Sequence, residues 1–206
     1  MPTRALTSVV LAAGEGTRMR SNRPKPLHLL CGRAMLLHIL AAVADLEPER
    51  AVVVVGHGAE RVTKTLLDDA PPDLVLDFVE QRVARGTGDA VSVALTAFPD
   101  DDVDDGDIVV RPGDTPLVQC GTIHGLVETH RSADAAATLL TATLPDPTGY
   151  GRVVRDRDDR VRRLVEDVDA PEAEREIAEV GTSMYCFRRS LLAPALRRLS
   201  PENAQG

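Results

Sequence analysis

Short apolar runs rich in valine alternate along this chain with longer segments in which apolar residues recur every three or four positions. The short runs predict buried strands, and the longer periodic segments predict helices that pack on them. Strands are predicted over residues 8–13, 51–55, 74–79, 107–111, 136–143, 151–155, 161–165 and 180–187. Helices are predicted over residues 34–44, 59–67, 89–98, 121–130 and 189–199.

Strands separated by helices are typical of a parallel sheet that is covered on both faces. The segment 151–165 differs, because two strand-like runs flank the polar turn 156–160 and predict an antiparallel hairpin. We therefore expect an α/β fold: one Rossmann-like, doubly wound domain over residues 1–206, with a mostly parallel, mixed sheet, helices on both faces and a small β-hairpin insertion. In such sheets, ligands bind beyond the carboxyl ends of the strands, where the strand order reverses.

Composition restricts the possible partners. The 206 residues carry a formal net charge of −8, which disfavours binding to nucleic acid. No apolar stretch reaches the length of a membrane span, and the N-terminus does not resemble a signal peptide, so a cytoplasmic location is expected. Cys31, Cys120 and Cys186 are far apart and lack zinc-ligand spacing, so they are predicted to be free, buried thiols.

The strongest chemical signal follows the first predicted strand, where the sequence continues as Gly14-Glu15-Gly16-Thr17-Arg18 and soon reaches Lys25. Glycines let backbone N–H groups approach an anion closely, and Arg18 and Lys25 add fixed positive charge. Only two of the 24 basic residues are lysines, and one of them is Lys25. The segment therefore favours binding of a polyphosphate.

Two better-known glycine loops do not fit this segment. Gly16 is followed by Thr17-Arg18 rather than by the Gly-Lys-Ser/Thr ending of a P-loop, and position 19 is Met where a dinucleotide fingerprint has its third glycine. On the glycines alone, an ordinary strand-to-helix turn with a surface arginine is an equally good interpretation.

Asp114 follows the apolar run 108–110, where an unpaired carboxylate is costly unless it is solvated, capping or bound to a cation. It is either a Mg²⁺ ligand or part of an Asx turn into Thr115-Pro116, and on the residues alone the turn is the better interpretation. The acidic run 100–107 lacks the glycine and glutamate of a calcium loop and predicts a solvated loop.

Gln81 and Gly86-Thr87 follow the third predicted strand. A glutamine amide has donors and an acceptor and so can read the edge of a pyrimidine. A polar loop in which Thr87 or Asp89 caps the next helix is the alternative, and both can hold together.

Further short motifs continue this pattern along nearly the whole chain. They are Leu11-Ala12-Ala13-Gly14, Pro24-Lys25-Pro26-Leu27-His28, Gly56-His57-Gly58, Gly86-Thr87-Gly88-Asp89-Ala90, Gly113-Asp114-Thr115-Pro116-Leu117, Asp146-Pro147-Thr148-Gly149-Tyr150-Gly151-Arg152, Val165-Glu166 with Asp169-Ala170, and Asn203-Ala204-Gln205-Gly206. In order and spacing they resemble sugar-nucleotide pyrophosphorylases. The chain is most similar to the N-terminal uridylyltransferase domain of the bacterial bifunctional UDP-N-acetylglucosamine pyrophosphorylase/glucosamine-1-phosphate N-acetyltransferase.

The resemblance implies the nucleotide-diphospho-sugar transferase fold and Mg²⁺-dependent synthesis of UDP-N-acetylglucosamine and pyrophosphate from UTP and N-acetylglucosamine 1-phosphate, a step toward cell-wall precursors. It implies catalytic roles for Arg18, Lys25 and Asp114, with Asp114 as the metal ligand. The matching nucleotide-binding residues are Leu11, Ala12, Ala13, Gly14, Lys25, Gln81, Gly86 and Thr87, and the sugar-binding residues are Gly151, Glu166 and Gly181.

The chain departs from the family pattern at Gly181-Thr182-Ser183, where relatives have Asn-Thr-Gly, and loss of that side chain is expected to cost about 1–3 kcal/mol of sugar binding. Arg111-Pro112 and Val168 are smaller departures. Relatives, which are homotrimeric, continue past the position of Gly206 with a second metal ligand, an asparagine, and with a β-helix acetyltransferase domain. We therefore expect a nucleotidyltransferase domain that is incomplete at its C-terminus and carries no acetyltransferase domain.

Two alternatives remain. The first is a related nucleotidyltransferase for another sugar phosphate or a cofactor precursor, against which Gln81, Gly86-Thr87 and the segment 146–151 argue. The second is a non-catalytic fragment that binds a nucleotide sugar, which Gly181 and the early end of the chain favour.

Overall fold

The computed structural model describes residues 4–83, 85–98 and 106–198, so most of the acidic run 100–107 and the closing residues 203–206 lie outside it. The chain forms two compact units. Unit 1 contains the chain up to Thr138 and again from Tyr185, and unit 2 contains Leu139–Met184. Within the described residues, no helix has both the length and the apolar character that crossing a membrane requires.

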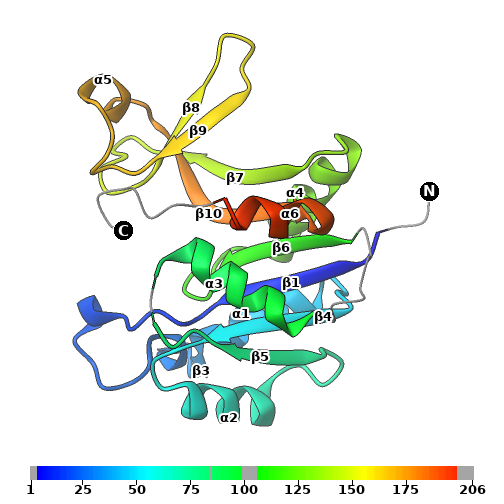
Figure 1. Ribbon diagram of the computed structural model, residues 1–206. Coiled ribbons are helices and arrows are strands. Elements are labelled where there is room, and N and C mark those ends of the chain that lie inside the picture. The colour runs from blue at the N-terminus through cyan, green and yellow to red at the C-terminus, as the bar shows by residue number, and fades with distance from the viewer. Residues whose placement is uncertain (1–3, 84, 99–105, 199–206) are drawn as a thin grey trace. The chain divides into compact units, whose positions relative to one another are not determined.

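The sheet of unit 1 has four parallel strands in the order β5-β4-β1-β6 (Figure 1). The strands are β1 (Leu6–Leu11), β4 (Arg50–Val55), β5 (Leu76–Glu80) and β6 (Asp107–Pro112). The chain moves outward from β1 to β4 and β5 and then returns to the other side of β1 as β6, so the strand order reverses between β1 and β6. The last residues of β10 (Glu179–Arg188) pair antiparallel with β6.

Both faces of this sheet are buried, as the valine-rich runs predict. On one face Val10 and Val53 pack with α1 (Met35–Ala44) and α2 (Ala59–Asp69). On the other face Val9, Val52 and Val54 pack with α3 (Thr87–Ala94), which continues as η3 (Leu95–Ala97), and with α6 (Arg189–Leu196). Neighbours Val9 and Val10 are both 0% exposed, which confirms a sheet covered by helices on both sides.

Unit 2 contains most of β7 (Ala137–Thr143), which pairs with β10, and the hairpin of β8 (Arg152–Arg155) and β9 (Val161–Val165). The two hairpin strands are antiparallel, which confirms the predicted insertion. Arg152 is only 2% exposed, yet it is compensated, because its guanidinium donates to Asp167 at 2.8 Å and to the carbonyls of Tyr150 and Arg175.

Several short elements were not predicted. They are η1 (Thr17–Met19), η2 (Lys25–Leu27), the two-residue strands β2 (Leu29–Leu30) and β3 (Arg33–Ala34), and α5 (Glu172–Arg175). The turn between β2 and β3 puts Cys31 at φ 50° and leaves it exposed, so the prediction of a buried thiol is wrong there. Cys120 is partly buried, and burial raises the pKa of the Cys186 thiol to about 12.

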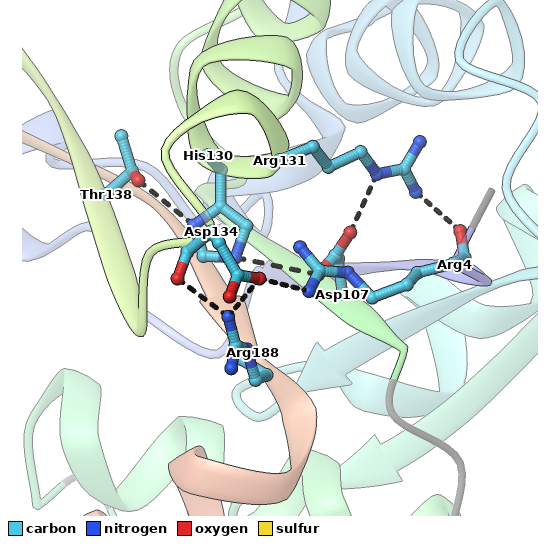
Figure 2. A network of polar contacts seen from close by, with 7 residues as sticks. All are labelled: Arg4, Asp107, His130, Arg131, Asp134, Thr138 and Arg188. Atoms are coloured by element: carbon cyan, nitrogen blue, oxygen red, sulfur yellow. Dashed lines mark hydrogen bonds and ion pairs between the residues drawn. The ribbon is translucent and has the colours of Figure 1, made fainter. Parts of the chain in front are cut away.

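A buried carboxylate organises the edge of unit 1 where β6 begins (Figure 2). Asp107 is fully buried, and Arg131, near the end of α4 (Cys120–Ser132), donates to it from Nε at 2.7 Å. Arg4 Nε lies 3.1 Å from the same carboxylate. Arg4 and Arg188 also pair with Asp134, so charged contacts join the chain start, β6, α4 and β10. Removing one partner of such a buried charge typically costs about 3–5 kcal/mol.

His130 contributes an imidazole to this network. Its ring is fully buried, with Nδ1 at 3.0 Å from Thr138 Oγ1 and Nε2 at 3.5 Å from Asp107 Oδ1. Burial lowers the pKa of His130 below 6.5, the positive charges of Arg4, Arg188 and Arg131 lower it further, and Asp107 opposes the shift. The folded protein therefore holds His130 neutral at pH values where the unfolded chain already binds a proton.

We expect the free energy of unfolding to decrease as the pH falls below about 6.5, with His130 contributing at most about 1.4 kcal/mol per pH unit. Urea unfolding of the wild type and His130→Gln at about pH 7.5 and 5.5 measures this contribution. The variant should lose less stability between the two pH values, whatever its stability at pH 7.5. An equal pH dependence in both proteins would show that His130 is not the responsible group.

Candidate functional site

The first loop of the site leaves β1 and turns back on itself. Ala12 N donates to the Val54 carbonyl at 2.8 Å, so the chain stays fixed for one residue beyond the strand. Gly16 then adopts a left-handed φ of 66°, and a Cβ there would lie 2.8 Å from Lys25 Cβ. Glycine at this position therefore lets the aliphatic stem of Lys25 lie against the loop.

The second loop follows β6 and meets the first at a distance that requires glycine. Gly113 N donates to the Leu11 carbonyl at 2.7 Å, and a Cβ on Gly113 would lie 2.8 Å from that carbonyl oxygen. The next residue is Asp114, and the Lys25 ammonium donates to its Oδ2. The structure therefore brings together Lys25 and Asp114, which are 89 positions apart, beside the residues that follow Leu11.

Both members of this ion pair reach solvent, since the side chains of Lys25 and Asp114 are 29% and 38% exposed. An exposed ion pair is worth little to stability and can exchange partners when a ligand arrives. Arg18 lies in η1, is exposed, and makes no ion pair with any residue that the structure describes. The loop therefore offers the unpaired guanidinium of Arg18 and one exchangeable ion pair at the point where the strand order reverses.

A third loop, which follows β4, supports the first two. A Cβ on Gly56 would lie 2.7 Å from the Ala13 carbonyl oxygen. Gly58 has a φ of 71°, and a Cβ there would lie 2.6 Å from Pro24 Cγ. Pro24 directly precedes Lys25, so these close approaches fix the backbone on which the lysine is carried.

Arg111 departs from the family pattern, and no role in the site was predicted for it. It is fully buried at the end of β6, and its Nη2 donates to the Thr115 carbonyl at 3.2 Å, so it braces the turn that contains Asp114. Burial lowers the pKa of Arg111 to about 10, which leaves it charged at neutral pH. A charged residue directly after the apolar run 108–110 was the available signal.

The loop after β5 is organised by Gln81. Its backbone N–H donates to the Val55 carbonyl at 2.8 Å, and its amide nitrogen donates to Asp89 at 2.7 Å and to the Gly86 carbonyl at 3.3 Å. No side-chain hydrogen bond caps α3, which begins at Thr87, so the predicted cap by Thr87 or Asp89 is wrong. Asp89 accepts from Gln81 instead, and the amide oxygen of Gln81 has no hydrogen bond to the described residues.

The residues predicted to bind sugar are together within unit 2. Gly181 N donates to the Gly151 carbonyl at 2.9 Å, and a Cβ on Gly151 would lie 3.5 Å from the exposed Glu166 carboxylate. A Cβ on Gly181 would lie 2.8 Å from Leu164 Cδ2. Leu164 therefore occupies the space that a larger side chain at position 181 would need.

The described residues offer few side-chain ligands for a metal ion. None of the described histidine, cysteine, aspartate and glutamate side chains form a group of three or more suited to a metal. Asp114 instead offers a single solvated carboxylate, which fits the way Mg²⁺ binds through one or two carboxylates together with phosphate oxygens and water.

The comparisons agree with this geometry. The family model of the MobA-like NTP transferase domain matches residues 8–205. The chain belongs to the MobA-like NTP transferase domain family. Among solved structures, a putative glucose-1-phosphate thymidylyltransferase from Bacillus anthracis covers 96% of the chain and 76% of its own length, with a TM-score of 0.74 at 18% identity. HddC from Yersinia pseudotuberculosis gives a TM-score of 0.67 at 19% identity over 91% of this chain and 78% of that one. The predicted fold class is confirmed.

Sequence relatives confirm the resemblance of the motifs. The chain is 48% identical over 205 residues to the bifunctional protein GlmU of Thermobifida fusca. The matched region covers 99% of this chain and 42% of that protein. It is 49% identical over 199 residues to GlmU of Mycobacterium avium, and this matched region covers 96% of this chain and 40% of that protein. The chain thus spans about two-fifths of the length of these relatives.

We expect Gly113→Ala to lower the free energy of unfolding by about 1–3 kcal/mol, because the new methyl group overlaps the Leu11 carbonyl and forces the two loops apart. Urea denaturation measures the loss. Gly125→Ala in α4 is the matched control, since a Cβ there meets nothing within 4 Å, and it should raise stability by about 0.5–1 kcal/mol. Equal effects of the two substitutions would show that the loops do not need the close approach at Gly113.

Proposed function

We propose that this chain catalyses transfer of a uridylyl group from UTP to N-acetylglucosamine 1-phosphate, giving UDP-N-acetylglucosamine and pyrophosphate. The observation that carries the proposal is the Lys25–Asp114 pair beside the glycine loop that follows β1. This pair places a cation and a carboxylate suited to a metal next to the backbone of the glycine loop. Nucleotidyl transfer needs such groups to bind the phosphates and to neutralise their charge. Membership of the NTP transferase family and the similarity to GlmU support the same reaction.

In this proposal, a phosphate oxygen of the sugar phosphate attacks the α-phosphorus of UTP. The new P–O bond forms as the bond to the bridging oxygen breaks, and pyrophosphate leaves with that electron pair. No nucleophilic side chain is required, because positioning and charge neutralisation carry most of phosphoryl transfer. Arg18 neutralises the leaving pyrophosphate, and Lys25 moves from Asp114 to the α-phosphate and the sugar phosphate.

Asp114 becomes available for a cation once Lys25 turns to phosphate. We propose that Asp114 would then be the residue that holds Mg²⁺. The metal supplies Lewis-acid neutralisation of the phosphate charge. Arg111 keeps the Asp114 turn in place through its bond to the Thr115 carbonyl.

Specificity is assigned to two groups of residues. Backbone atoms of Leu11, Ala12, Ala13 and Gly14 contact the nucleotide. Gln81 accepts from a uracil N–H through its unpaired amide oxygen, with Gly86 and Thr87 completing the base contacts.

In unit 2, Gly151, Glu166 and Gly181 orient the sugar, and the Glu166 carboxylate accepts from sugar hydroxyls. Leu164 beside Gly181 adds an apolar contact in place of a hydrogen bond. The proposed setting is the cytoplasm, where UTP and sugar phosphates are made.

Asp114→Ala and Lys25→Ala should each lower pyrophosphate release from UTP, Mg²⁺ and N-acetylglucosamine 1-phosphate by about 100-fold or more, because Lys25 would neutralise phosphate charge directly and Asp114 would hold the metal that does so. Lys64→Ala is the matched control, since Lys64 is the other lysine of the chain and lies on α2, and it should retain full activity. Glucose 1-phosphate, run in parallel, tests the preference for the acetamido sugar.

Two results would contradict the proposed reaction. Pyrophosphate release that persists in both the Asp114 and the Lys25 variants would remove these residues from the chemistry. Binding of UDP-N-acetylglucosamine without any Mg²⁺-dependent turnover would identify a non-catalytic nucleotide-sugar-binding protein instead.

A further inference from the structure

We propose that unit 1 contains a second anion site, separate from the nucleotide loops, that binds an organic phosphate with an apolar portion. The site is a cavity of roughly 430 Å³ between α2, η2 and the β2–β3 turn. Arg23, Arg33 and Arg61 line it over a floor that includes Leu27 and Leu37. None of these residues has a role in the proposed transfer reaction, so this inference does not depend on it.

The charge distribution around the cavity is unusual for this protein. The whole chain has a net charge of −8, yet residues 16–44 contain no aspartate or glutamate and five cations. The five are Arg18, Arg20, Arg23, Lys25 and Arg33. Two of them, Arg18 and Lys25, belong to the nucleotide loop, whereas Arg23 and Arg33 line the cavity.

The three cavity arginines are available to bind an anion. Within the part of the chain that the structure describes, Arg23, Arg33 and Arg61 form no ion pair, although Asp69 also lines the cavity. Other arginines of unit 1, such as Arg4, Arg131 and Arg188, are paired with aspartates. Three unpaired guanidinium groups around one cavity repel one another, and a phosphate dianion relieves that repulsion through charge-assisted hydrogen bonds.

The backbone that carries these arginines is held in place before any ligand arrives. Arg23 N donates to Ser21 Oγ at 3.1 Å, and the Arg23 carbonyl lies 3.2 Å from His28 Nε2. Arg33 pairs with Leu30 across the β2–β3 turn, and His38 Nε2 of α1 lies 2.9 Å from the Leu30 carbonyl. The cavity walls therefore come from fixed elements, which lowers the entropy cost of binding.

The floor of the cavity determines the rest of the ligand. Leu27, Ala34 and Leu37 line it but are buried, whereas Leu29, which also lines it, is 59% exposed. Inorganic phosphate would satisfy the arginines and leave the apolar Leu29 side chain in contact with water. A phosphate monoester with an apolar group contacts the arginines through its phosphate and covers the apolar lining with its other end. The site should therefore bind it more tightly than it binds inorganic phosphate or the apolar group alone.

Phenyl phosphate is the probe, titrated into the ¹⁵N-labelled full chain with backbone amide shifts of Leu27, Gly32 and Thr65 as the readout. We expect saturable binding that is about tenfold tighter than that of inorganic phosphate, with no saturable shift from phenol. The double variant Arg33→Gln, Arg61→Gln should weaken the affinity for phenyl phosphate at least tenfold. The matched control Arg157→Gln, Arg162→Gln removes the same charge from exposed hairpin positions of unit 2 and should bind as the wild type does.

Three outcomes would overturn the proposal. Shifts that do not saturate, or that fall equally in both double variants, would indicate non-specific attraction to positive charge. Binding abolished by Lys25→Ala but retained in the Arg33, Arg61 variant would assign the probe to the nucleotide loop. Thermal unfolding of each variant establishes that it is folded, and Arg23→Gln, an exposed loop position, gives a single-site test that leaves β3 and α2 unchanged.

Discussion

Strand β1 is paired on both sides, and the rest of unit 1 depends on this constraint. Leu11 lies opposite Val54 of β4 and Pro112 of β6, so three parallel strands end at the same level of the sheet. Their loops must then pass one another within a small space. Glycines at positions 56 and 113 make this possible, because a side chain at either would collide with the carbonyl oxygen of Ala13 or Leu11.

Strand β6 shows how one fold uses a carboxylate in two different ways. Asp107, at its first residue, is fully buried and held by Arg4 and Arg131. These contacts cannot exchange partners without a large desolvation cost, so loss of either arginine would leave a buried charge uncompensated and destabilise the sheet. Asp114, just beyond the other end, is 38% exposed and paired with a lysine that also reaches solvent. Exposure makes that pair exchangeable, which is what binding of a metal and a polyphosphate requires.

The alternation of apolar runs and periodic segments was sufficient to predict the sheet, its covering helices and the hairpin of β8 and β9. Predicted and observed bounds differ by a few residues, as at β1, which was predicted over 8–13 and spans Leu6–Leu11. The β2–β3 turn has two-residue strands, and α5 spans only Glu172–Arg175, so neither extends over enough residues to produce a periodic pattern.

Charged residues were the hardest to place from the sequence. Asp107 and Arg152 are buried, but nothing local distinguishes them from surface residues, because their charged partners Arg131 and Asp167 lie 24 and 15 positions away in the chain. The Lys25–Asp114 contact was predicted only as a shared role, since the strand order that joins the two loops is not encoded in either segment. The cluster of Arg23, Arg33 and Arg61 was not predicted for the same reason, as Arg61 comes from a separate helix.

The most direct test of this account is the affinity of the chain for UTP with and without Mg²⁺, measured by calorimetry for the wild type and Asp114→Asn. If the Lys25–Asp114 pair exchanges for a metal and phosphates, Mg²⁺ should strengthen UTP binding to the wild type. In the variant that gain should disappear, and metal-free binding should become tighter, because Lys25 is released and a negative charge is removed. The same gain from Mg²⁺ in both proteins would contradict the account, because Asp114 would then have no part in holding the metal.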